Sequence, residues 1–219
     1  QGSVLGPLLF ILYTNDFHNC LDICQTSQYA DDTAIYSSNK DLDVALFSLE
    51  MDLKNVKNWY DANKLKLNIN KTQFIIFGNK NQVKAAHGKT ILFDGEHLRQ
   101  AEAVNYLGIL LDNSLSYDQH ISELSKKVSR LLGALSNIRY LLPLKTRTTV
   151  YKSLILPHII YGICVWSATN KHNLHRLGVL VNRICRHILM VGRQEMHTVD
   201  LYSTLNMMNF QQLASYHST

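Results

Sequence analysis

The sequence predicts an α+β fold for residues 1–112, followed by a purely helical region over residues 113–219. Before residue 112, short stretches rich in β-branched and aromatic residues alternate with helical spacing, and after it only helical spacing remains. The charge changes along with the pattern. Residues 1–60 carry 3 basic and 8 acidic side chains, whereas residues 113–219 carry 12 basic and 4 acidic ones. We therefore expect two domains, with the boundary at about residue 112.

Composition and hydropathy exclude several classes of protein. Hydrophobic residues make up 46% of the 219 residues, which excludes wholesale disorder, and three Pro with ten Gly exclude a collagen-like chain. Four Cys are too few for a disulfide scaffold. The apolar stretch Leu154–Trp166 is interrupted by Pro157 and is shorter than the roughly 20 residues that a membrane helix needs. We expect it to form a buried helical segment or strand, and we expect no membrane association.

The first domain begins with a helix and a hairpin. A short apolar helix is expected over residues 8–17, beginning near Pro7, because proline is favoured in the first turn of a helix. Tyr29–Tyr36 has β-prone flanks around two adjacent aspartates, which predicts a tight hairpin with Asp31 and Asp32 at its tip.

A longer helix and several strands complete the first domain. Apolar residues spaced three and four apart predict a helix from about residue 42 to residue 59, capped by Asp41 or Asp43. A strand is expected over residues 72–77. Residues 90–98 should form a hairpin with an Asp-Gly turn, and residues 104–111 another strand.

The second domain is predicted as amphipathic helices with a basic surface. Helical spacing covers residues 121–138, about 146–156 and 174–188, with a weaker pattern over 198–216. Between Glu123 and Glu195 there is no Asp or Glu, although this span contains twelve Lys or Arg. An ordinary soluble helix intersperses both signs, so we expect this surface to bind a polyanion. The basic residues outside the apolar stripes of the first and third helices are the candidates: Lys126, Lys127, Arg130, Arg176, Arg183 and Arg186.

Adjacent aspartates at a hairpin tip are candidate metal ligands. Ionised carboxylates are the ligands that Mg²⁺ prefers, and two such ions can stabilise the attacking and leaving oxygens of a phosphoryl transfer. Turns also favour Asp for local reasons, so the pair alone indicates little. Its flanks indicate more: Tyr-Ala-Asp-Asp follows Gln-Gly-Ser-Val-Leu-Gly-Pro-Leu-Leu-Phe in the same chain.

Through these motifs the sequence resembles the reverse transcriptase of a non-LTR (LINE-type) retrotransposon over nearly its whole length. Gln1–Asp16 is similar to the segment that contacts template and nucleotide, and Tyr29–Asp32 to the catalytic tetrad. Leu67–Phe77 resembles the next motif, and Tyr106–Asp112 the primer-grip motif. The resemblance implies part of a right-hand polymerase palm, made of antiparallel strands plus helices, with a primer-grip hairpin. A helical thumb would follow.

The resemblance also implies roles for single residues. Asp31 and Asp32 would hold Mg²⁺ or Mn²⁺, with two ions in the complete enzyme, and Lys71 would act beside the leaving pyrophosphate as a proton donor or charge stabiliser. Tyr29 and Ala30 would lie near the primer terminus. The nucleotide and templating base would lie beside Gln1 and Gly2, and the primer end beside Leu107 and Gly108. From the residues alone, Lys71 could equally be a solvated lysine and Gly108 a bulge.

One departure from the family pattern is a missing carboxylate. The family's site uses three, and the first, which lies upstream together with the fingers, is not in this sequence. Asp16 and Asp22 are the remaining early acids, and both come too late in the chain to replace it. The expectation is that this sequence is a fragment of a longer polyprotein that also supplies the fingers and an endonuclease domain. Alone, it should not polymerise.

The expected partners follow from this resemblance. They are an RNA template, a DNA primer and deoxynucleotide triphosphates, in an intracellular setting that is nuclear during integration and otherwise a cytoplasmic ribonucleoprotein. Two alternatives stay open: a catalytically inactive remnant that only binds nucleic acid, and a maturase-like splicing protein. Cys20 with Cys24, and His172 with His175, lack a second ligand pair at zinc-finger spacing, so no zinc site is assigned. Tyr151, Tyr161 and Trp166 are expected to pack inside the helical domain.

Overall fold

The computed structural model describes residues 3–218, so the predicted site residues Gln1 and Gly2 lie outside the described residues. The chain forms two compact units, unit 1 (Gln1–Leu107) and unit 2 (Gly108–Thr219). Helices and short strands mix in unit 1, whereas unit 2 is helical apart from one strand, and this agrees with the predicted α+β class. The division falls inside a hairpin, a few residues before the boundary placed by composition.

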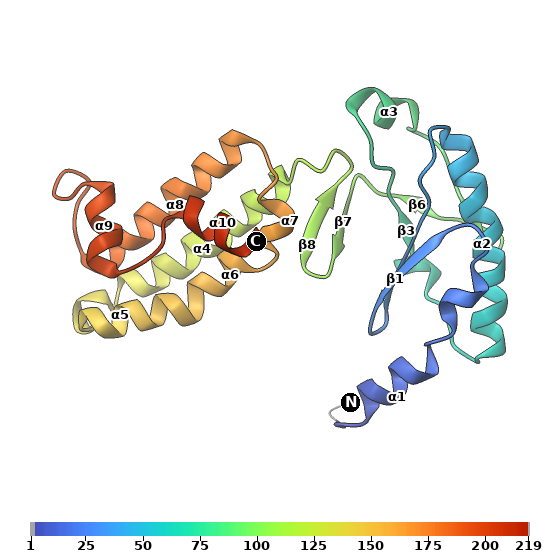
Figure 1. The fold of residues 1–219 in the computed structure, drawn as a ribbon, viewed down its shortest axis with the longest axis horizontal. Helices are drawn as coiled ribbons and strands as arrows, with labels where there is room; N and C mark the ends of the chain where they lie inside the picture. Colours follow the sequence, from blue (N-terminus) through green and yellow to red (C-terminus); the bar gives the residue numbers. More distant parts are fainter. Residues whose placement is uncertain (1–2, 219) are drawn as a thin grey trace. The chain divides into compact units, whose positions relative to one another are not determined.

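Unit 1 is built around one long helix (Figure 1). Its helical segments are α1 (Gly6–Tyr13), η1 (Phe17–Cys20), α2 (Leu42–Ala62), η2 (Ile69–Lys71) and α3 (Lys80–Ala85). Its strands are short: β1 (Gln25–Tyr29), β2 (Asp32–Tyr36), β3 (Gln73–Phe74), β4 (Leu92–Phe93), β5 (Glu96–His97), β6 (Arg99–Gln100) and β7 (Ala103–Tyr106).

Helix α2 forms where the apolar spacing predicted it. Asp41 is its N-cap, and the Asp41 side chain accepts a hydrogen bond from the backbone N–H of Asp43. The apolar face of α2 buries Leu46 and Leu53 against residues of the β4–β5 region, and this forms the core of unit 1. The buried members of that core are Leu46, Leu53, Ile91, Phe93 and Leu98.

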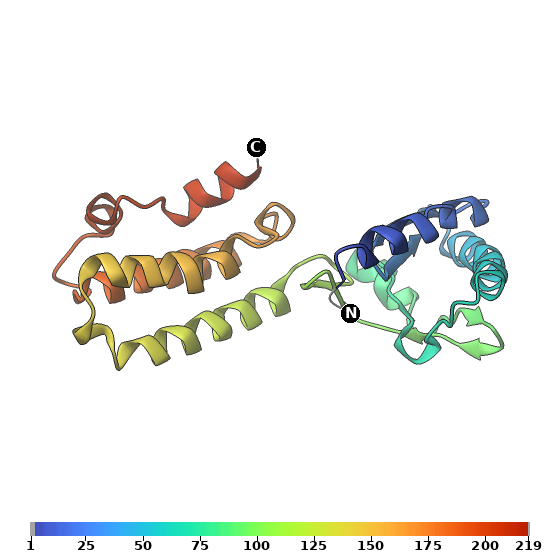
Figure 2. The ribbon, with the colours of Figure 1, turned by 90° about the horizontal axis from the view of Figure 1, so that it is seen from below.

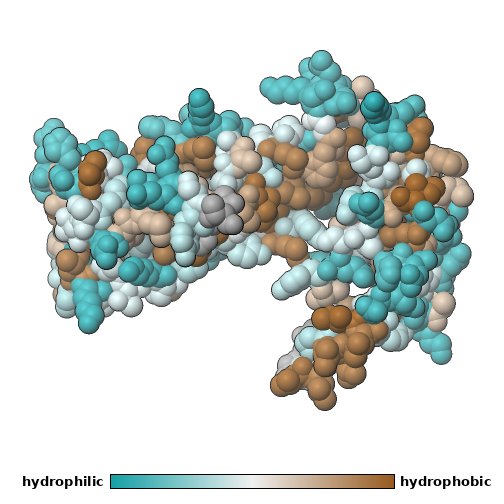
Figure 3. All heavy atoms as spheres, viewed as in Figure 1, coloured by the Kyte–Doolittle hydropathy of each residue, from teal (hydrophilic) through white to brown (hydrophobic). Residues whose placement is uncertain are grey.

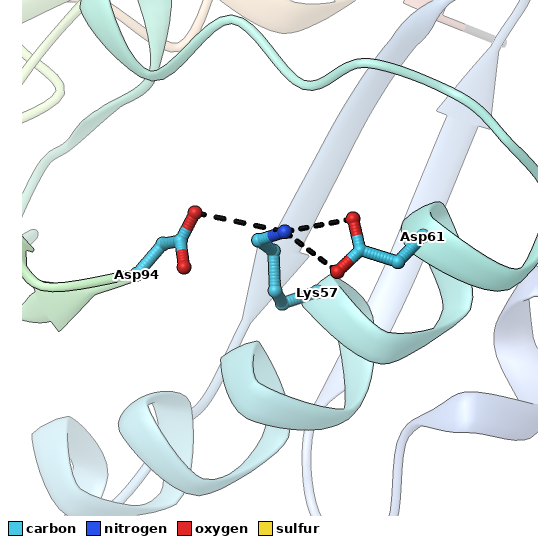
Figure 4. A network of polar contacts seen from close by, with 3 residues as sticks. All are labelled: Lys57, Asp61 and Asp94. Carbon is cyan, nitrogen blue, oxygen red and sulfur yellow. Dashed lines mark hydrogen bonds and ion pairs between the residues drawn. The ribbon is translucent and has the colours of Figure 1, made fainter.

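Polar side chains of α2 hold the loops of unit 1 in place. The Lys57 ammonium lies between Asp61, 2.6 Å away, and Asp94 in the β4–β5 turn, 3.6 Å away (Figure 4). Glu50 accepts the backbone N–H of Leu92 at 2.9 Å. Lys89 pairs with Asp43 in the first turn of the helix. One helix therefore organises both ends of the unit through its charges as well as through its core.

Of the three predictions that concern the strands after α2, the structure confirms one and corrects two. Leu92 pairs with His97 and Phe93 with Glu96, so the predicted Asp-Gly hairpin is confirmed. The strand expected over 72–77 shortens to β3, because its partner in the sheet, β6, has two residues as well. The single strand expected over 104–111 is wrong: Leu107 and Gly108, with φ of 49° and 78°, turn the chain between β7 and β8 (Ile109–Asp112).

Helix α1 is apolar without being buried. It begins at Gly6 and ends at Tyr13, earlier than the predicted end at residue 17, because the chain then turns into η1. None of its residues is buried, and Leu9 and Leu12 are exposed by 60% and 64%. Figure 3 shows these apolar side chains gathered in one patch. The helix therefore has no apolar partner among the described residues of unit 1.

Unit 2 consists of helices packed side by side around one large core (Figures 1 and 2). After β8 come α4 (Asp118–Ser136), η3 (Arg139–Leu141), α5 (Leu144–Val150), the π-helical turn η4 (Tyr151–Ile155), α6 (Leu156–Ile160), α7 (Ile163–Trp166), α8 (Lys171–Leu189), α9 (Thr198–Leu205) and α10 (Phe210–Ser218). The helices predicted around residues 121–138, 146–156 and 174–188 are present. Residues 154–166 are helical, and no helix among residues 3–218 is long and apolar enough to cross a membrane.

The core of unit 2 contains two of the three aromatic residues expected there. Trp166 and Tyr151 are exposed by 0% and 1%, and the Trp166 indole donates to the Tyr161 carbonyl at 2.8 Å. The expectation for Tyr161 is wrong, because its side chain is 56% exposed. The backbone explains this: Gly162 follows in a left-handed conformation, so the chain turns sharply between α6 and α7 and leaves Tyr161 outside.

Candidate functional site

The predicted catalytic tetrad forms the turn of an antiparallel hairpin. Strand β1 ends at Tyr29 and β2 begins at Asp32, and these two residues pair across the strands. Ala30 and Asp31 make the connection, so Asp31 occupies the tip and Asp32 the first position of β2. Both aspartates are exposed, and neither carboxylate has a hydrogen-bond or ion-pair partner within residues 3–218. The oxygens of two adjacent carboxylates are thus available to a cation.

Ala30 has an unusual backbone conformation. Its φ is 53°, in the left-handed region that residues with a Cβ seldom adopt, at a cost of about 1–3 kcal/mol. Strain of this kind persists only where the surroundings fix the chain. Here the five-residue ladder of β1 and β2, from Gln25–Tyr36 to Tyr29–Asp32, fixes both ends of the turn.

A buried carboxylate anchors the segment that leads into this hairpin. Asp52 of α2 is 0% exposed and accepts the backbone N–H groups of Asp22, Ile23 and Cys24 at 3.0, 3.0 and 2.6 Å. Burial opposes ionisation of Asp52, but the three N–H donors more than offset it, so the pKa of Asp52 lies below its ordinary value. A structural carboxylate therefore positions the start of β1.

The other early acids are engaged in packing contacts. Asp16 accepts a hydrogen bond from the Trp59 indole at 3.2 Å, and Asp22 accepts one from the Asn55 amide at 3.0 Å. Both contacts hold the segment before β1 against α2. Both acids therefore serve the packing of unit 1.

Lys71 and Tyr29 are exposed on unit 1. Lys71 is the last residue of η2 rather than the first residue of a strand, and within the described residues it makes no hydrogen bond or ion pair with Asp31 or Asp32. Tyr29 is 67% exposed next to the aspartate turn. On the same strand, the Ser27 hydroxyl lies 3.5 Å from the hydroxyl of Tyr106 in β7, which brings the motif at Tyr106 beside the hairpin that carries Asp31 and Asp32.

The donor set at the hairpin suits a hard divalent cation only in part. Asp31 and Asp32 offer carboxylate oxygens of the kind that Mg²⁺ and Mn²⁺ prefer. Within residues 3–218, however, no group of three or more His, Cys, Asp or Glu side chains comes together as a metal site. The hairpin would therefore supply two of the ligands of such an ion. Cys20 and Cys24 are poor candidates, because burial raises the pKa of both thiols, that of Cys24 to about 12.

Unit 2 has a basic hollow of about 460 Å³ between the turn before β8 and helix α4. It is lined by Gly108 from the β7–β8 turn, by residues of α4 including Lys126, Lys127 and Arg130, and by Tyr161. A Cβ on Gly108 would lie 3.4 Å from the Tyr161 ring, and its φ of 78° already disfavours any other residue. The structure thus brings the second predicted primer-grip residue and the three predicted α4 cations to one surface.

Two histidines line the same hollow and are held neutral. Burial lowers the pKa of His120, although the nearby Glu123 charge opposes this. Burial and the positive charge of Lys127 lower the pKa of His158. At neutral pH the positive charge of the hollow therefore comes from Lys126, Lys127 and Arg130, and both histidines can add to it when the pH falls.

The three predicted arginines of α8 differ in their surroundings. Arg176 and Arg183 are exposed and lie two turns apart on one face of the helix. Arg186 is half-buried and donates to the carbonyl oxygens of Gly192 and Met196, at 3.3 and 2.9 Å. It therefore helps to fix the loop after α8. None of the three lines the hollow beside α4.

Comparison with known proteins decides the family. The sequence model described as "Reverse transcriptase (RNA-dependent DNA polymerase)" matches residues 1–111, which include the aspartate hairpin and the Leu107–Gly108 turn. The chain belongs to the reverse transcriptase family. No solved structure is significantly similar to it.

Curated relatives of this reverse transcriptase chain come from mobile elements. It is 27% identical over 86% of its length to the RNA-directed DNA polymerase from mobile element jockey of Drosophila melanogaster, and covers 21% of that protein. It is 30% identical to the probable RNA-directed DNA polymerase from transposon BS of the same species, with 86% of the chain and 22% of the relative covered. The chain thus spans about a fifth of these relatives' length. The resemblance to non-LTR retrotransposon enzymes is confirmed.

Sequence reasoning missed two buried aspartates of this reverse transcriptase chain. Asp52 is one. Asp112, at the end of β8, is 8% exposed and accepts the backbone N–H groups of Ser114, Ser116 and Tyr117, so it joins β8 to the start of α4. A signal for Asp52 exists: it lies between Leu49 and Val56 on the apolar stripe of α2, where a carboxylate must find buried donors.

Proposed function

We propose that this chain is part of an RNA-directed DNA polymerase, with unit 1 belonging to its palm and unit 2 forming its thumb. The single observation that carries the proposal is the pair of exposed, unpartnered carboxylates of Asp31 and Asp32 at the tip of a rigidly paired hairpin. In the reaction, a primer 3′-hydroxyl attacks the α-phosphorus of a deoxynucleotide triphosphate, the bond to the β-phosphate oxygen breaks, and pyrophosphate leaves.

Several residues of unit 1 would each have a separate role in this reaction. Asp31 and Asp32 would hold Mg²⁺ or Mn²⁺, which supplies charge stabilisation to the attacking and leaving oxygens. Lys71 is exposed and could give a proton or a positive charge to the leaving pyrophosphate. Tyr29 and Ala30, beside the carboxylates, would border the primer terminus. Gln1 and Gly2 would border the incoming nucleotide.

Unit 2 would hold the RNA template and DNA primer by their phosphates. Lys126, Lys127 and Arg130 share one hollow with Gly108, and none of them forms an ion pair with a carboxylate among residues 108–218. Cations without a protein counter-ion can neutralise phosphates and release condensed counterions. Leu107 and Gly108 would place the primer end. Such an enzyme would work on RNA in a ribonucleoprotein and on DNA in the nucleus.

Primer extension tests the proposal. In the polymerase that contains this chain, Asp31→Asn or Asp32→Asn should reduce extension with Mg²⁺ by at least about a thousandfold, because each removes an ionised metal ligand. Glu102→Gln, which neutralises an exposed acid of the same unit, is the matched control and should leave extension unchanged. Full extension by the Asp31→Asn protein would overturn the assignment.

A second candidate is a chain that binds nucleic acid without polymerising. It is favoured because the hairpin has only two carboxylates, and no three His, Cys, Asp or Glu side chains come together as a metal site within residues 3–218. The 219 residues alone should show no extension, while they bind an RNA–DNA duplex with an affinity that falls steeply with salt. Changing Lys126, Lys127 and Arg130 to Gln should make the slope of log K against log salt shallower by about 0.9 for each phosphate that is no longer neutralised. Extension by the isolated chain excludes the binding-only candidate, and a slope that the triple variant leaves unchanged contradicts the thumb assignment.

A further inference from the structure

A histidine of α4 is hydrogen-bonded to the strand that follows the Gly108 turn. Strand β8 belongs to a two-stranded sheet, so one of its edges has no neighbouring strand in the part of the chain that the structure describes. The backbone N–H of Leu110 donates to Nδ1 of His120, at 3.3 Å. The side chains on either side of Leu110, those of Ile109 and Leu111, pack against the core of unit 2. His120 thus holds the backbone of β8 two residues after Gly108.

The half-buried His120 ring packs against a buried aromatic residue of that core. Its centroid lies 6.1 Å from that of Trp166, and the two ring planes meet at 47°. Trp166 is fully buried and stacks on Phe210 of α10, with ring centroids 6.2 Å apart. These contacts restrict the orientation of the imidazole, as the side chains behind a functional group must do if its geometry is to be exact.

The same tryptophan fixes the residue that lies next to Gly108. The Trp166 indole donates to the Tyr161 carbonyl at 2.8 Å, and a Cβ on Gly108 would lie 3.4 Å from the Tyr161 ring. Gly108, His120 and Tyr161 all line the basic hollow. The segment from Gly108 to Leu110 is therefore supported at both ends, by Tyr161 at the turn and by His120 two residues later.

We propose that His120 is a positioning residue of the polymerase: its hydrogen bond to Leu110 sets the place of the Gly108 turn, and through that turn the place of the primer 3′-hydroxyl. This inference rests on the proposed function, in which the primer end lies beside Gly108. Its effect is on orientation rather than on affinity, because Nδ1 of His120 binds the protein backbone and the charge of the hollow belongs to its lysines and arginine. Displacing a reacting atom by about 1 Å can slow a reaction about a hundredfold, so a contact outside the reaction centre can limit the rate.

Hydrogen exchange in the polymerase that contains this chain tests the contact itself. His120→Phe keeps a ring against Trp166 and removes the acceptor, whereas His120→Asn keeps an acceptor oxygen on Cγ, where histidine has Nδ1. The Leu110 amide should exchange about fivefold faster in His120→Phe than in the parent, because one hydrogen bond is lost, and within about twofold of the parent rate in His120→Asn. Exchange that His120→Phe leaves unchanged would overturn the proposal.

A matched control for this substitution lies on another helix of the same unit. His172 occupies an exposed position of α8, so His172→Phe makes the same change of side chain away from β8. It should leave the exchange of the Leu110 amide as it is in the parent. Faster exchange in both phenylalanine variants would show a general loosening of unit 2 and would overturn the specific role of His120.

Single-nucleotide addition by the same proteins tests the positioning role. With saturating template and primer, His120→Phe should add a nucleotide about tenfold more slowly than the parent, because the 3′-hydroxyl is misplaced. The Kd for the duplex should stay within about twofold of the parent value, since the cations of the hollow remain. His120→Asn should recover most of the rate. Equal losses of rate in the two variants would show that the acceptor is not what matters, and would overturn the proposal.

The failure of this proposal and that of the proposed function give different results. If the Asp31→Asn protein extends primers fully, the proposed function fails, while the exchange of Leu110 still reports the contact with His120. If the Asp31→Asn protein is inactive and His120→Phe adds nucleotides at the parent rate, the proposed function stands and the positioning role of His120 is overturned. A slow His120→Phe protein with normal duplex affinity, rescued by His120→Asn, is the result expected.

Discussion

Within the described residues, the ion pairs between side chains all lie in unit 1, and residues 108–218 contain none. Two of these pairs tie α2 to other segments of unit 1: Lys57 of α2 binds Asp94, and Asp43 of α2 binds Lys89, while Lys57 also binds Asp61 one turn along the helix. Unit 2 instead carries cations over a span of 71 residues that has no acid to pair with them. In unit 1 most carboxylates therefore serve the fold, whereas those of Asp31 and Asp32 do not.

The apolar cores of the two units differ as well. Unit 2 buries Trp166, Tyr151 and a set of aliphatic residues from every helical segment except η3 and α5 in one continuous core. Unit 1 has a smaller core, centred on Leu53 and Phe93, and leaves the apolar helix α1 without a buried residue. Unit 2 therefore has the means to fold on its own core, whereas unit 1 relies more on polar anchors such as Asp52 and Lys57.

The largest expected effect compares the two buried aspartates. Asp52→Ala leaves three backbone N–H groups of unit 1 without an acceptor, and Asp112→Ala does the same in unit 2. Each substitution should lower the free energy of unfolding of its own unit by about 3 kcal/mol or more. The chain has two tryptophans, Trp59 in unit 1 and Trp166 in unit 2, so the fluorescence of Trp166→Phe and Trp59→Phe proteins reports each unit separately.

The exposed acids Glu102 and Glu123 provide the controls for this comparison. Their replacement by Ala should change the free energy of unfolding by no more than about 0.5 kcal/mol. If Asp52→Ala shifted the Trp166 transition as much as the Trp59 transition, the two units would unfold as one, and their comparison as separate bodies would be broken.

A glycine of unit 2 gives the next largest effect. Gly162 has φ of 63°, and a Cβ placed there would lie 2.4 Å from Cδ1 of Ile109. Gly162→Ala should therefore destabilise unit 2 by about 2–3 kcal/mol through strain and overpacking. Gly178→Ala on α8, where a Cβ meets no atom within 4 Å, should instead stabilise it by about 0.5–1 kcal/mol. A similar loss in both variants would show that the tight contact at Gly162 does not exist.

The features predicted correctly are those that local chemistry determines. Asp41 caps α2, the Asp94–Gly95 pair forms a hairpin turn, and helical spacing predicts α4 and α8, because each depends on residues within a few positions of one another. The errors have two causes. The length of the strand over 72–77 depends on its partner β6, a distant segment that spacing within the sequence does not reveal. The wrong strand over 104–111 and the exposure of Tyr161 follow from left-handed backbone conformations at Leu107, Gly108 and Gly162, which apolar spacing does not reveal either.

The candidate site shows the same limit. The Tyr29–Asp32 hairpin could be predicted because its motif is contiguous. The contact of Asp52 with residues 22–24 could not, although a carboxylate on an apolar stripe does signal buried donors.

The smallest expected effect, and the sharpest distinction between the units, is their response to acid. In unit 2 burial lowers the pKa of His120, His158 and His187, so the folded state binds protons less readily than the unfolded state. The unfolded state gains protons first as the pH falls through about 6.5, the ordinary value for histidine, and unit 2 should lose stability from that point downward.

Unit 1 should respond at a lower pH through a different group. The N–H donors around Asp52 hold its pKa below the ordinary value, so its contribution is complete at neutral pH. It is lost only as the pH falls below about 3.9, where the unfolded carboxyl takes up a proton, and on toward the folded pKa.

Urea unfolding between pH 7 and pH 4.5, followed separately through Trp59 and Trp166, should show a falling midpoint for Trp166 and a nearly constant one for Trp59. The replacement His158→Gln should reduce the pH dependence of the Trp166 midpoint, since it removes one of the three titrating groups. A Trp166 midpoint independent of pH would mean that these half-buried histidines of unit 2 bind protons as readily in the folded state as in the unfolded state, and the contrast with unit 1 would then rest on ion pairs and cores alone.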